Sequence, residues 1–346
     1  MTLRAALHWA ILLALSGIFS GLLLLVQLPA ALLLGPMIAA ILFAVSGREL
    51  SIHSWLFAFA QSMIGLLMAR ALTVSVLREI GLHWPIFITG VFSVILISFG
   101  LGWVLARLRV MPGSTALWGS SPGAASAMTL LCESFGADQR LVAFMLYLRV
   151  VLVALATSIV AHFATHGQHG GTLPHAIRAD SPLWLTPLLA AAATLLGQYT
   201  RLPAGPLLLS MVFGMIGQDG FGFHFALPSW LLAPSYVLVG WTIGLRFTAD
   251  ILRHVWRALP AVTLSSCTLI VVCALLAWPI AHLAHVDLLS AHLATSPGGA
   301  DSVAIIAASN PVDMPFVMAM QVARFLMLML VAPSIATLLA RFLPTE

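Results

Sequence analysis

Long apolar runs separated by short polar breaks make up almost the whole chain. In its first half they lie near residues 8–27, 31–46, 55–73, 84–106 and 138–163. Most approach the length of about 20 residues that a helix needs to cross a membrane, and they lack the alternating pattern of outer-membrane barrel strands. The pattern predicts an all-α polytopic membrane protein, with the run after Arg4 retained as the first helix and not cleaved as a signal peptide.

The composition agrees with this prediction and narrows the classes of function. Hydrophobic residues make up 61% of the chain and charged residues 8%, against about 25% charged residues in ordinary soluble domains. The fifteen basic residues are all arginine, which is typical of membrane-flanking positions and provides no basic stripe for nucleic acid. Cys132, Cys267 and Cys273 lack CxxC or Cys/His spacing, so we expect no metal, no cofactor and no disulfide framework.

Two short polar stretches interrupt the apolar runs and resemble each other. Residues 120–126 read Ser-Ser-Pro-Gly-Ala-Ala-Ser, and residues 295–301 read Thr-Ser-Pro-Gly-Gly-Ala-Asp. Each is followed within one helix by a lone arginine, Arg149 or Arg324. A stretch so rich in helix-breaking residues must be covered by protein and cannot lie against lipid. The arrangement indicates paired ligand-binding elements inside a membrane.

Landmarks of the first half return in the second half at a nearly constant distance. Two Leu-Pro-Ala turns are 174 residues apart, and four further pairs are 175 residues apart. The pairs are Leu28/Leu202, Ser121/Ser296, Arg149/Arg324, Asp138/Asp313 and Gly65/Gly240. This constancy predicts a duplication, with a first membrane repeat at 1–165, a linker at 166–180 and a second repeat at 181–346. Two such halves are typical of many secondary transporters.

The placement of the arginines favours inverted repeats of about five transmembrane helices each. If the N-terminus is cytoplasmic and each Ser-Pro-Gly stretch enters and leaves on one side, most arginines face the cytoplasm, as the positive-inside rule requires. If each stretch crossed the membrane fully, four of them would move outside: Arg140, Arg201, Arg253 and Arg257. We therefore expect each repeat to contain a re-entrant or broken helix, with the second repeat inverted by the odd number of crossings.

The Ser-Pro-Gly stretches can bind polar groups within the membrane. A break near the midplane leaves backbone N–H and C=O groups without helical partners, and helix ends favour ions of opposite sign. The alternative is that Ser, Gly and Pro only permit tight helix crossing. The candidate substrate-binding residues are Ser120, Ser121, Gly123, Ser126, Arg149, Thr295, Ser296, Gly298, Gly299 and Arg324.

The two arginines determine the charge of this site. Arg149 follows Asp138 by eleven residues, which at about 1.5 Å per residue is roughly 16 Å into a core about 30 Å thick. A buried arginine is tolerated only beside a cavity or an acceptor. Each arginine could therefore brace the neighbouring polar stretch, contact the ligand, or do both. Two midplane guanidiniums favour an anionic substrate such as a carboxylate.

Asp301 breaks the symmetry, because Ser126 stands at the matched position. An intramembrane carboxylate is a candidate for carrying a proton or coordinating Na⁺, and Ser302 next to it can assist. The alternative is a structural salt bridge to Arg324 or Arg149. Asp138 and Asp313 stand at the starts of helices, where we expect N-capping.

These motifs resemble those of the duplicated membrane AbrB family of Gram-negative bacteria. The resemblance covers nearly the whole chain and implies an inner-membrane location. The labels used for that family, ammonia monooxygenase and regulator of gene expression, have no counterpart in these residues, which include no copper or iron ligand cluster and no DNA-binding helix-turn-helix. Members often carry an acidic residue after Pro-Gly in either half, whereas this chain has Ser126 in the first. The resemblance rests on the paired turns, the paired Pro-Gly stretches, both arginines, Leu34-Gly35-Pro36-Met37, Gly136-Ala137-Asp138 and Val142-Ala143.

Together these features predict a secondary transporter of a small anionic organic solute. Without a nucleotide motif, coupling would be to H⁺ or Na⁺. The alternative is a non-transporting membrane regulator or sensor that affects gene expression through a ligand or partner protein. No enzyme is expected, since no nucleophile–base pair is readable. The expected partners are the solute, the ion and the lipid bilayer, and a homodimer is kept open because transporters of this build are commonly dimers.

Overall fold

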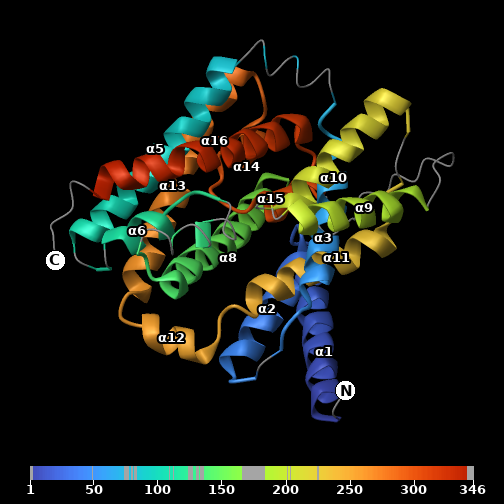
Figure 1. Ribbon diagram of the computed structural model, residues 1–346, viewed down its shortest axis with the longest axis horizontal. Helices are drawn as coiled ribbons and strands as arrows, with labels where there is room; N and C mark the ends of the chain where they lie inside the picture. Colours follow the sequence, from blue (N-terminus) through green and yellow to red (C-terminus); the bar gives the residue numbers. More distant parts are fainter. Residues whose placement is uncertain are drawn as a thin grey trace. The chain divides into compact units, whose positions relative to one another are not determined.

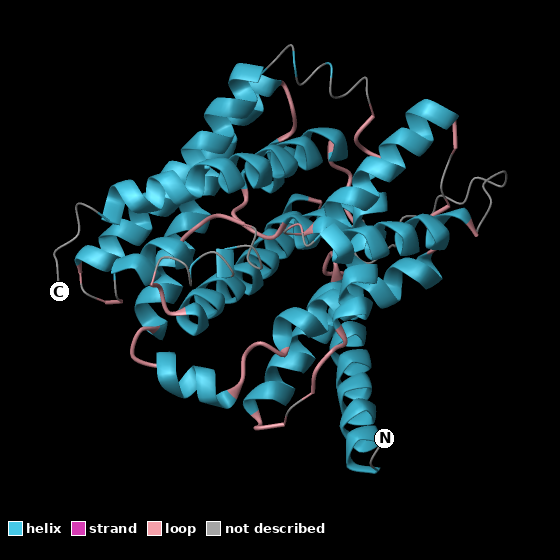
Figure 2. Ribbon diagram, in the orientation of Figure 1, coloured by secondary structure: helices cyan, strands magenta, loops and turns pink. Residues whose placement is uncertain are grey.

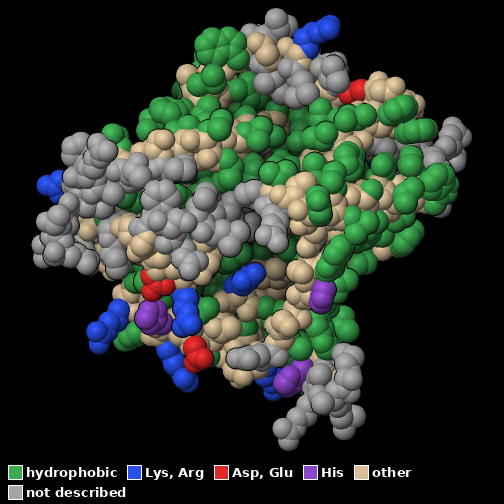
Figure 3. Space-filling view, in the orientation of Figure 1, with side chains coloured by type: hydrophobic (Ala, Val, Ile, Leu, Met, Phe, Trp, Pro, Cys, Tyr) green, Lys and Arg blue, Asp and Glu red, His purple; other side chains and the backbone are tan. Residues whose placement is uncertain are grey.

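The computed structural model describes residues 3–48, 50–73, 84–108, 110–111, 113–123, 136–165, 184–200, 204–223 and 226–340, with the isolated positions 78, 81, 128, 129, 132 and 202. In this part of the chain helices and loops are present and no strand occurs, as Figures 1 and 2 show. Hydrophobic side chains cover most of the described surface on the face in Figure 3. The all-helical prediction is confirmed. The predicted linker at 166–180 lies outside the described residues.

Five helices are long and apolar enough to cross a membrane. Two further apolar helices have 15 and 16 residues, which is below the roughly 20 residues of a typical span. The multi-pass character is therefore supported, while the count of five crossings per repeat stays a prediction. The five candidate spans are Ala6–Leu25, Trp84–Arg107, Gln139–Ala164, Leu259–Ala284 and Met314–Ala332.

The chain forms two compact units, each built from matched parts of both predicted repeats. Unit 1 comprises Met1–Glu79, Ser158–Ala249 and Ala304–Pro315, and unit 2 comprises Ile80–Thr157, Asp250–Val303 and Phe316–Glu346. Unit 1 contains α1 (Leu3–Leu25), α2 (Ala31–Val45), α3 (Ser54–Ala69), α9 (Leu185–Thr200), α10 (Gly205–Met215), the π-helix η1 (Ile216–Gly220) and α11 (Ser229–Gly244).

Unit 1 is held together by close helix contacts that recur at the matched positions. A side chain at Gly65 of α3 would clash with the Leu207 carbonyl of α10, and one at Gly240 of α11 would clash with the Leu33 carbonyl of α2. Small residues permit this approach between membrane helices. The two Leu-Pro-Ala turns also match in geometry, because Ala30 and Ala204 both adopt the left-handed conformation, with φ of 56° and 52°.

Unit 2 contains the longer helices and both polar stretches. Its helices are α5 (Trp84–Arg107), α6 (Gly113–Gly119), α8 (Gln139–Ala164), α12 (Ala249–Val255), α13 (Leu259–Ala284), α14 (Leu288–Thr295), α15 (Ala300–Ala308) and α16 (Met314–Ala340), with the ends of α8, α12, α15 and α16 extending past its boundaries.

Capping residues fix the starts of α8 and α14 in unit 2. As predicted, Asp138 accepts hydrogen bonds from the backbone N–H groups of Arg140 (2.8 Å) and Leu141 (3.3 Å). Asp287 caps α14 by accepting from the N–H of Ser290 at 2.8 Å. These caps satisfy N–H groups that a helix start leaves without partners. They therefore fix where α8 and α14 begin.

Candidate functional site

Both arginines singled out from the sequence lie in unit 2 and are buried. Arg149 on α8 and Arg324 on α16 are each 3% exposed, deep within helices that are among the candidate spans. A guanidinium cannot lose its charge readily and needs acceptors when removed from water. The contacts below show which groups supply them.

Arg149 binds the backbone at the end of α6. Its Nη1 donates to the Ser120 carbonyl at 2.9 Å and its Nη2 to the Ser121 carbonyl. These carbonyls follow directly after the last residue of a short helix, where the helix dipole is negative and C=O groups lack helical partners. The positive side chain satisfies both requirements at once. Arg149 therefore braces the first polar stretch.

Arg324 binds the second polar stretch in the same way and has one more partner. Its Nη1 donates to the Ser296 carbonyl, and its Nη2 donates to the Gly298 carbonyl at 2.9 Å and to Oε1 of Gln321. Gln321, on the same helix and 1% exposed, also donates from Nε2 to the Leu293 carbonyl of α14 at 2.8 Å. The second stretch is thus braced by an arginine and a glutamine together.

Several of these contacts recur at positions 175 residues apart. Arg149 binds the Ser121 carbonyl and Arg324 the matched Ser296 carbonyl. Ser98 of α5 donates its hydroxyl proton to the Ser120 carbonyl, while at the matched pair Thr295 donates to the Cys273 carbonyl of α13 at 3.1 Å. The donor and acceptor have exchanged positions, but the same two sites remain joined.

The two polar stretches meet inside unit 2. A Cβ on Gly123, which has φ of 108°, would lie 3.7 Å from Nε of Arg324 and 3.8 Å from the Gly298 carbonyl oxygen. Such a positive φ favours glycine. On the other side, a Cβ on Gly298 would come within 2.9 Å of Val153 of α8. Each stretch is therefore packed against the arginine helix of the other half.

The hydroxyl groups of the two stretches are used mainly within their own helices. Those of Ser121 and Ser296 donate to carbonyls three residues back, at 2.9 and 3.1 Å, and that of Thr295 donates to Ala291 at 2.9 Å. Their oxygens can still accept, but their protons are engaged. Ser120 is buried beside Arg149. Ser126, also named from the sequence, lies outside the described residues.

Asp301 begins α15, one residue past the second bend. It is partly buried, and its Oδ1 accepts from the N–H of Ser302 at 3.2 Å. The Ser302 hydroxyl donates to the carbonyl of Gly299 at 3.0 Å. Among the described residues no ion pair joins Asp301 to either arginine, since the pairs present are Arg253 with Asp250 and His254 with Asp138. A helix N-terminus favours a carboxylate, so Asp301 is placed without a cationic side chain as partner.

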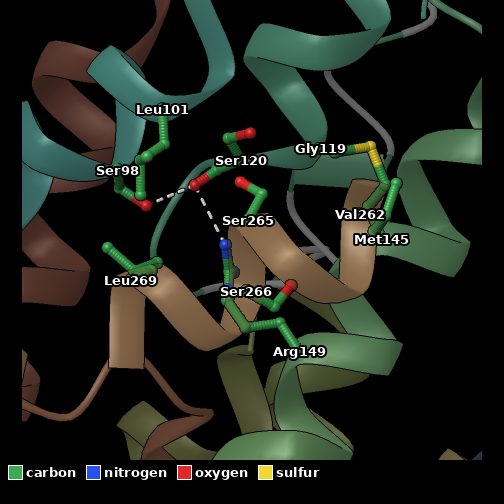
Figure 4. Close-up of a pocket in the computed structure, with 10 residues that line it drawn as sticks. All are labelled: Ser98, Leu101, Gly119, Ser120, Met145, Arg149, Val262, Ser265, Ser266 and Leu269. Atoms are coloured by element: carbon green, nitrogen blue, oxygen red, sulfur yellow. Dashed lines mark hydrogen bonds between the residues drawn. The ribbon is translucent and has the colours of Figure 1, made fainter. Parts of the chain in front are cut away.

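A small pocket opens beside Arg149, and Figure 4 shows its lining. Polar groups come from Ser98 of α5, Ser120 after α6, Arg149 of α8, and Ser265 and Ser266 of α13. The apolar part of the lining is formed by Leu101, Met145, Val262 and Leu269, with Gly119. The pocket lies wholly within unit 2.

Sequence reasoning found both arginines and both bends but missed Ser98, Ser265 and Ser266. Each is a lone or paired hydroxyl in a strongly apolar helix, which is common and carries little signal by itself. The offset of 175 could have marked Ser98, because Cys273 stands at the matched position. Gln321 could have been ranked higher for the same reason, since its matched residue is the apolar Leu146.

The arrangement suits the binding of an anion in an apolar surrounding. Within the described part of the chain, carbonyl and amide oxygens accept from the two guanidiniums, and these acceptors carry no net charge. Both side chains therefore keep a full positive charge to be balanced. In a low-dielectric surrounding that charge attracts an anion much more strongly than in water.

Comparisons with known proteins agree on the family. A family model described as "Transition state regulatory protein AbrB" matches residues 32–340. The chain is 42% identical over 341 residues to "Putative regulator AbrB" of Escherichia coli (strain K12), covering 98% of each chain. It is 28% identical over 305 residues to "Uncharacterized protein YhjN" of Bacillus subtilis (strain 168), covering 82% of this chain and 78% of that one.

Proposed function

The chain belongs to the AbrB family, and from that premise and the two braced arginines we propose that it is a secondary transporter of a small anionic organic solute. The solute binds at the two Ser-Pro-Gly stretches, and movement is driven by an H⁺ or Na⁺ gradient. The observation that carries the proposal is the presence of two buried arginines, each bound to carbonyls at the end of a short helix.

Helix length supports the proposal that these elements do not cross the membrane as ordinary spans. α14 has 8 residues and α15 has 9, with Ser296–Gly299 between them. At about 1.5 Å per residue each is roughly 12–14 Å long, less than half of a core about 30 Å thick. Discontinuous helices that end at mid-membrane are the usual sites of substrate and ion in secondary transporters.

The division of the chain into two units supports the transport mechanism. Each unit takes equivalent parts of both predicted repeats, and the two polar stretches with both arginines fall in the same unit. In transporters with inverted repeats, one bundle moves against the other around a fixed site. Unit 2 would carry the site and unit 1 would act as the scaffold.

Transport by purified protein in liposomes tests the proposal. We expect uptake of at least one radiolabelled carboxylate from a panel of acetate, pyruvate, succinate and malate, dependent on an imposed H⁺ or Na⁺ gradient. Arg149→Gln should abolish uptake, and collapse of the gradient by an ionophore should do the same. Arg253→Gln is the matched control, because that exposed arginine on α12 pairs only loosely with Asp250, at 3.8 Å. Binding without gradient-dependent flux would contradict the transporter.

A regulator or sensor is the second candidate, favoured by the printed name of the relative at 42% identity. In that case the same site would bind a ligand and signal to a partner protein. Complementation separates the two functions: a gene deletion is rescued with the wild type or with a variant that no longer transports. Restoration of the normal transcript pattern by the inactive transporter would favour the regulator.

A further inference from the structure

The two arginines differ in how completely their donors are used. Nη1 and Nη2 of Arg149 bind two carbonyls, but its buried Nε has no hydrogen-bond partner among the described residues. Arg324 makes three hydrogen bonds, and Gln321 supports it from its own helix. A buried unpaired donor is rare in proteins and indicates that a partner from outside the chain completes it.

The pocket beside Arg149 adds further groups without partners. Ser120 is 7% and Ser266 is 7% exposed, and within the described part of the chain no hydrogen bond is formed by their hydroxyls or by that of Ser265. Figure 4 shows these three serines around the guanidinium of Arg149. Three hydroxyls and one guanidinium therefore face one small space.

The matched place beside Arg324 is built differently. The residues 175 positions before Ser265 and Ser266 are Gly90 and Val91 of α5, both apolar. Met320 and Ile280 fill the space at Gly90, where a Cβ would lie 2.8 Å from the Met320 methyl group and 3.2 Å from Ile280. The hydroxyls thus accompany Arg149 alone, and the symmetry of the two braces does not extend to the pocket.

We infer that the pocket formed by Arg149, Ser120, Ser265 and Ser266 binds the carboxylate group of the solute, while Arg324 holds the second stretch in shape without contacting it. This inference rests on the proposed function and assigns its anion subsite to one half of the molecule. The free volume, about 10 Å³, is room for about one water-sized group. One carboxylate oxygen therefore enters the pocket, and the remainder of the solute lies outside it.

The chemistry of the lining fits a carboxylate better than a cation or a neutral group. A guanidinium can only donate, and hydroxyls can donate to an anion while their own oxygens accept elsewhere. Charge-assisted hydrogen bonds of this kind are about twice as strong as neutral ones. No acidic residue is among those that line the pocket, so a cation would find no balancing charge there.

Charged thiol reagents test the inference without knowledge of the natural solute. Ser266→Cys is introduced into a chain whose three native cysteines are replaced by alanine. Its reaction rates with an anionic sulfonate and a cationic trimethylammonium methanethiosulfonate are measured relative to a free thiol. We expect a preference of about tenfold or more for the anionic reagent, because Arg149 lies beside the cysteine.

Second-site variants identify the source of the preference. It should vanish in Ser266→Cys/Arg149→Gln and persist in Ser266→Cys/Arg149→Lys, which keeps the charge. Val91→Cys, the matched control beside Arg324, should show no anionic preference. Size-exclusion profiles check that each variant is folded.

Absence of reaction with either reagent, or a preference unchanged by Arg149→Gln, would overturn the inference. Flux with no anionic preference would leave the transporter standing and remove only this subsite. The preference without flux would do the reverse.

Discussion

The Arg149 brace and the Arg324 brace share one design and differ in completeness. In both, an arginine on a long helix binds the carbonyls at the end of a short helix 28 residues earlier in the chain. Around Arg324 the donors are met by three acceptors and the matched space is packed with Met320. Around Arg149 one donor and three neighbouring hydroxyls are left without partners.

This difference teaches that a duplicated element can keep its structural contact while its binding chemistry diverges. The bond from arginine to the bent stretch is needed in both halves, because each bend leaves carbonyls that lipid cannot satisfy. The residues next to that bond are under no such requirement. Polar groups on α13 and apolar ones on α5 could therefore accompany the same brace.

Removal of each arginine tests the comparison with the largest expected effect. Hydrogen bonds to charged groups contribute about 1.5–3 kcal/mol each before the relief of burying the charge is taken into account. We expect Arg324→Ala to lower the free energy of unfolding by about 3–5 kcal/mol and Arg149→Ala by about 2–3 kcal/mol. SDS titration in mixed micelles measures both. Equal losses would mean that the two braces are equivalent, and Arg253→Ala should leave the stability unchanged.

The sequence predicted the helices and the braced arginines well, because both depend on local patterns. The run predicted at 84–106 is α5 at Trp84–Arg107, and the burial of Arg149 and Arg324 follows from a lone charge in a long apolar run. The choice left open between bracing and ligand contact was answered for bracing by the carbonyl contacts of both side chains.

The pocket could not be predicted, since its members are brought together only by packing. Ser98, Ser120 and Ser266 are on or next to three different helices, and no spacing along the chain relates them. The meeting of Gly123 with Arg324 is likewise a tertiary contact between the two halves. Periodicity identifies an apolar face, but it does not say which polar residues of separate helices will converge.

Exchange of Gln321 with its matched residue sharpens the comparison at a smaller scale. Gln321→Leu removes a partner from Arg324 and from the Leu293 carbonyl, and we expect a loss of about 1–2 kcal/mol. Leu146→Gln, the reverse change beside Arg149, should destabilise by about 1–3 kcal/mol, because it buries an amide with no partner prepared for it. The same SDS titration measures both variants. A neutral Gln321→Leu would show that Arg324 needs no support beyond its carbonyls.

Asp301→Ser has the smallest expected effect on stability and separates coupling from binding. It places on the second stretch the residue type that the first has at position 126. The carboxylate receives one backbone hydrogen bond, from Ser302, and its attraction to the helix N-terminus is worth about 0.3–1 kcal/mol, so folding should change by no more than that. If Asp301 carries the coupling ion, the variant should still exchange solute across liposomes by counterflow but should no longer accumulate it against a gradient. Asp250→Asn on the exposed face of α12 should retain both activities. Gradient-driven accumulation by Asp301→Ser at the wild-type level would move the coupling site elsewhere and leave the division of roles between the two halves resting on Arg149 alone.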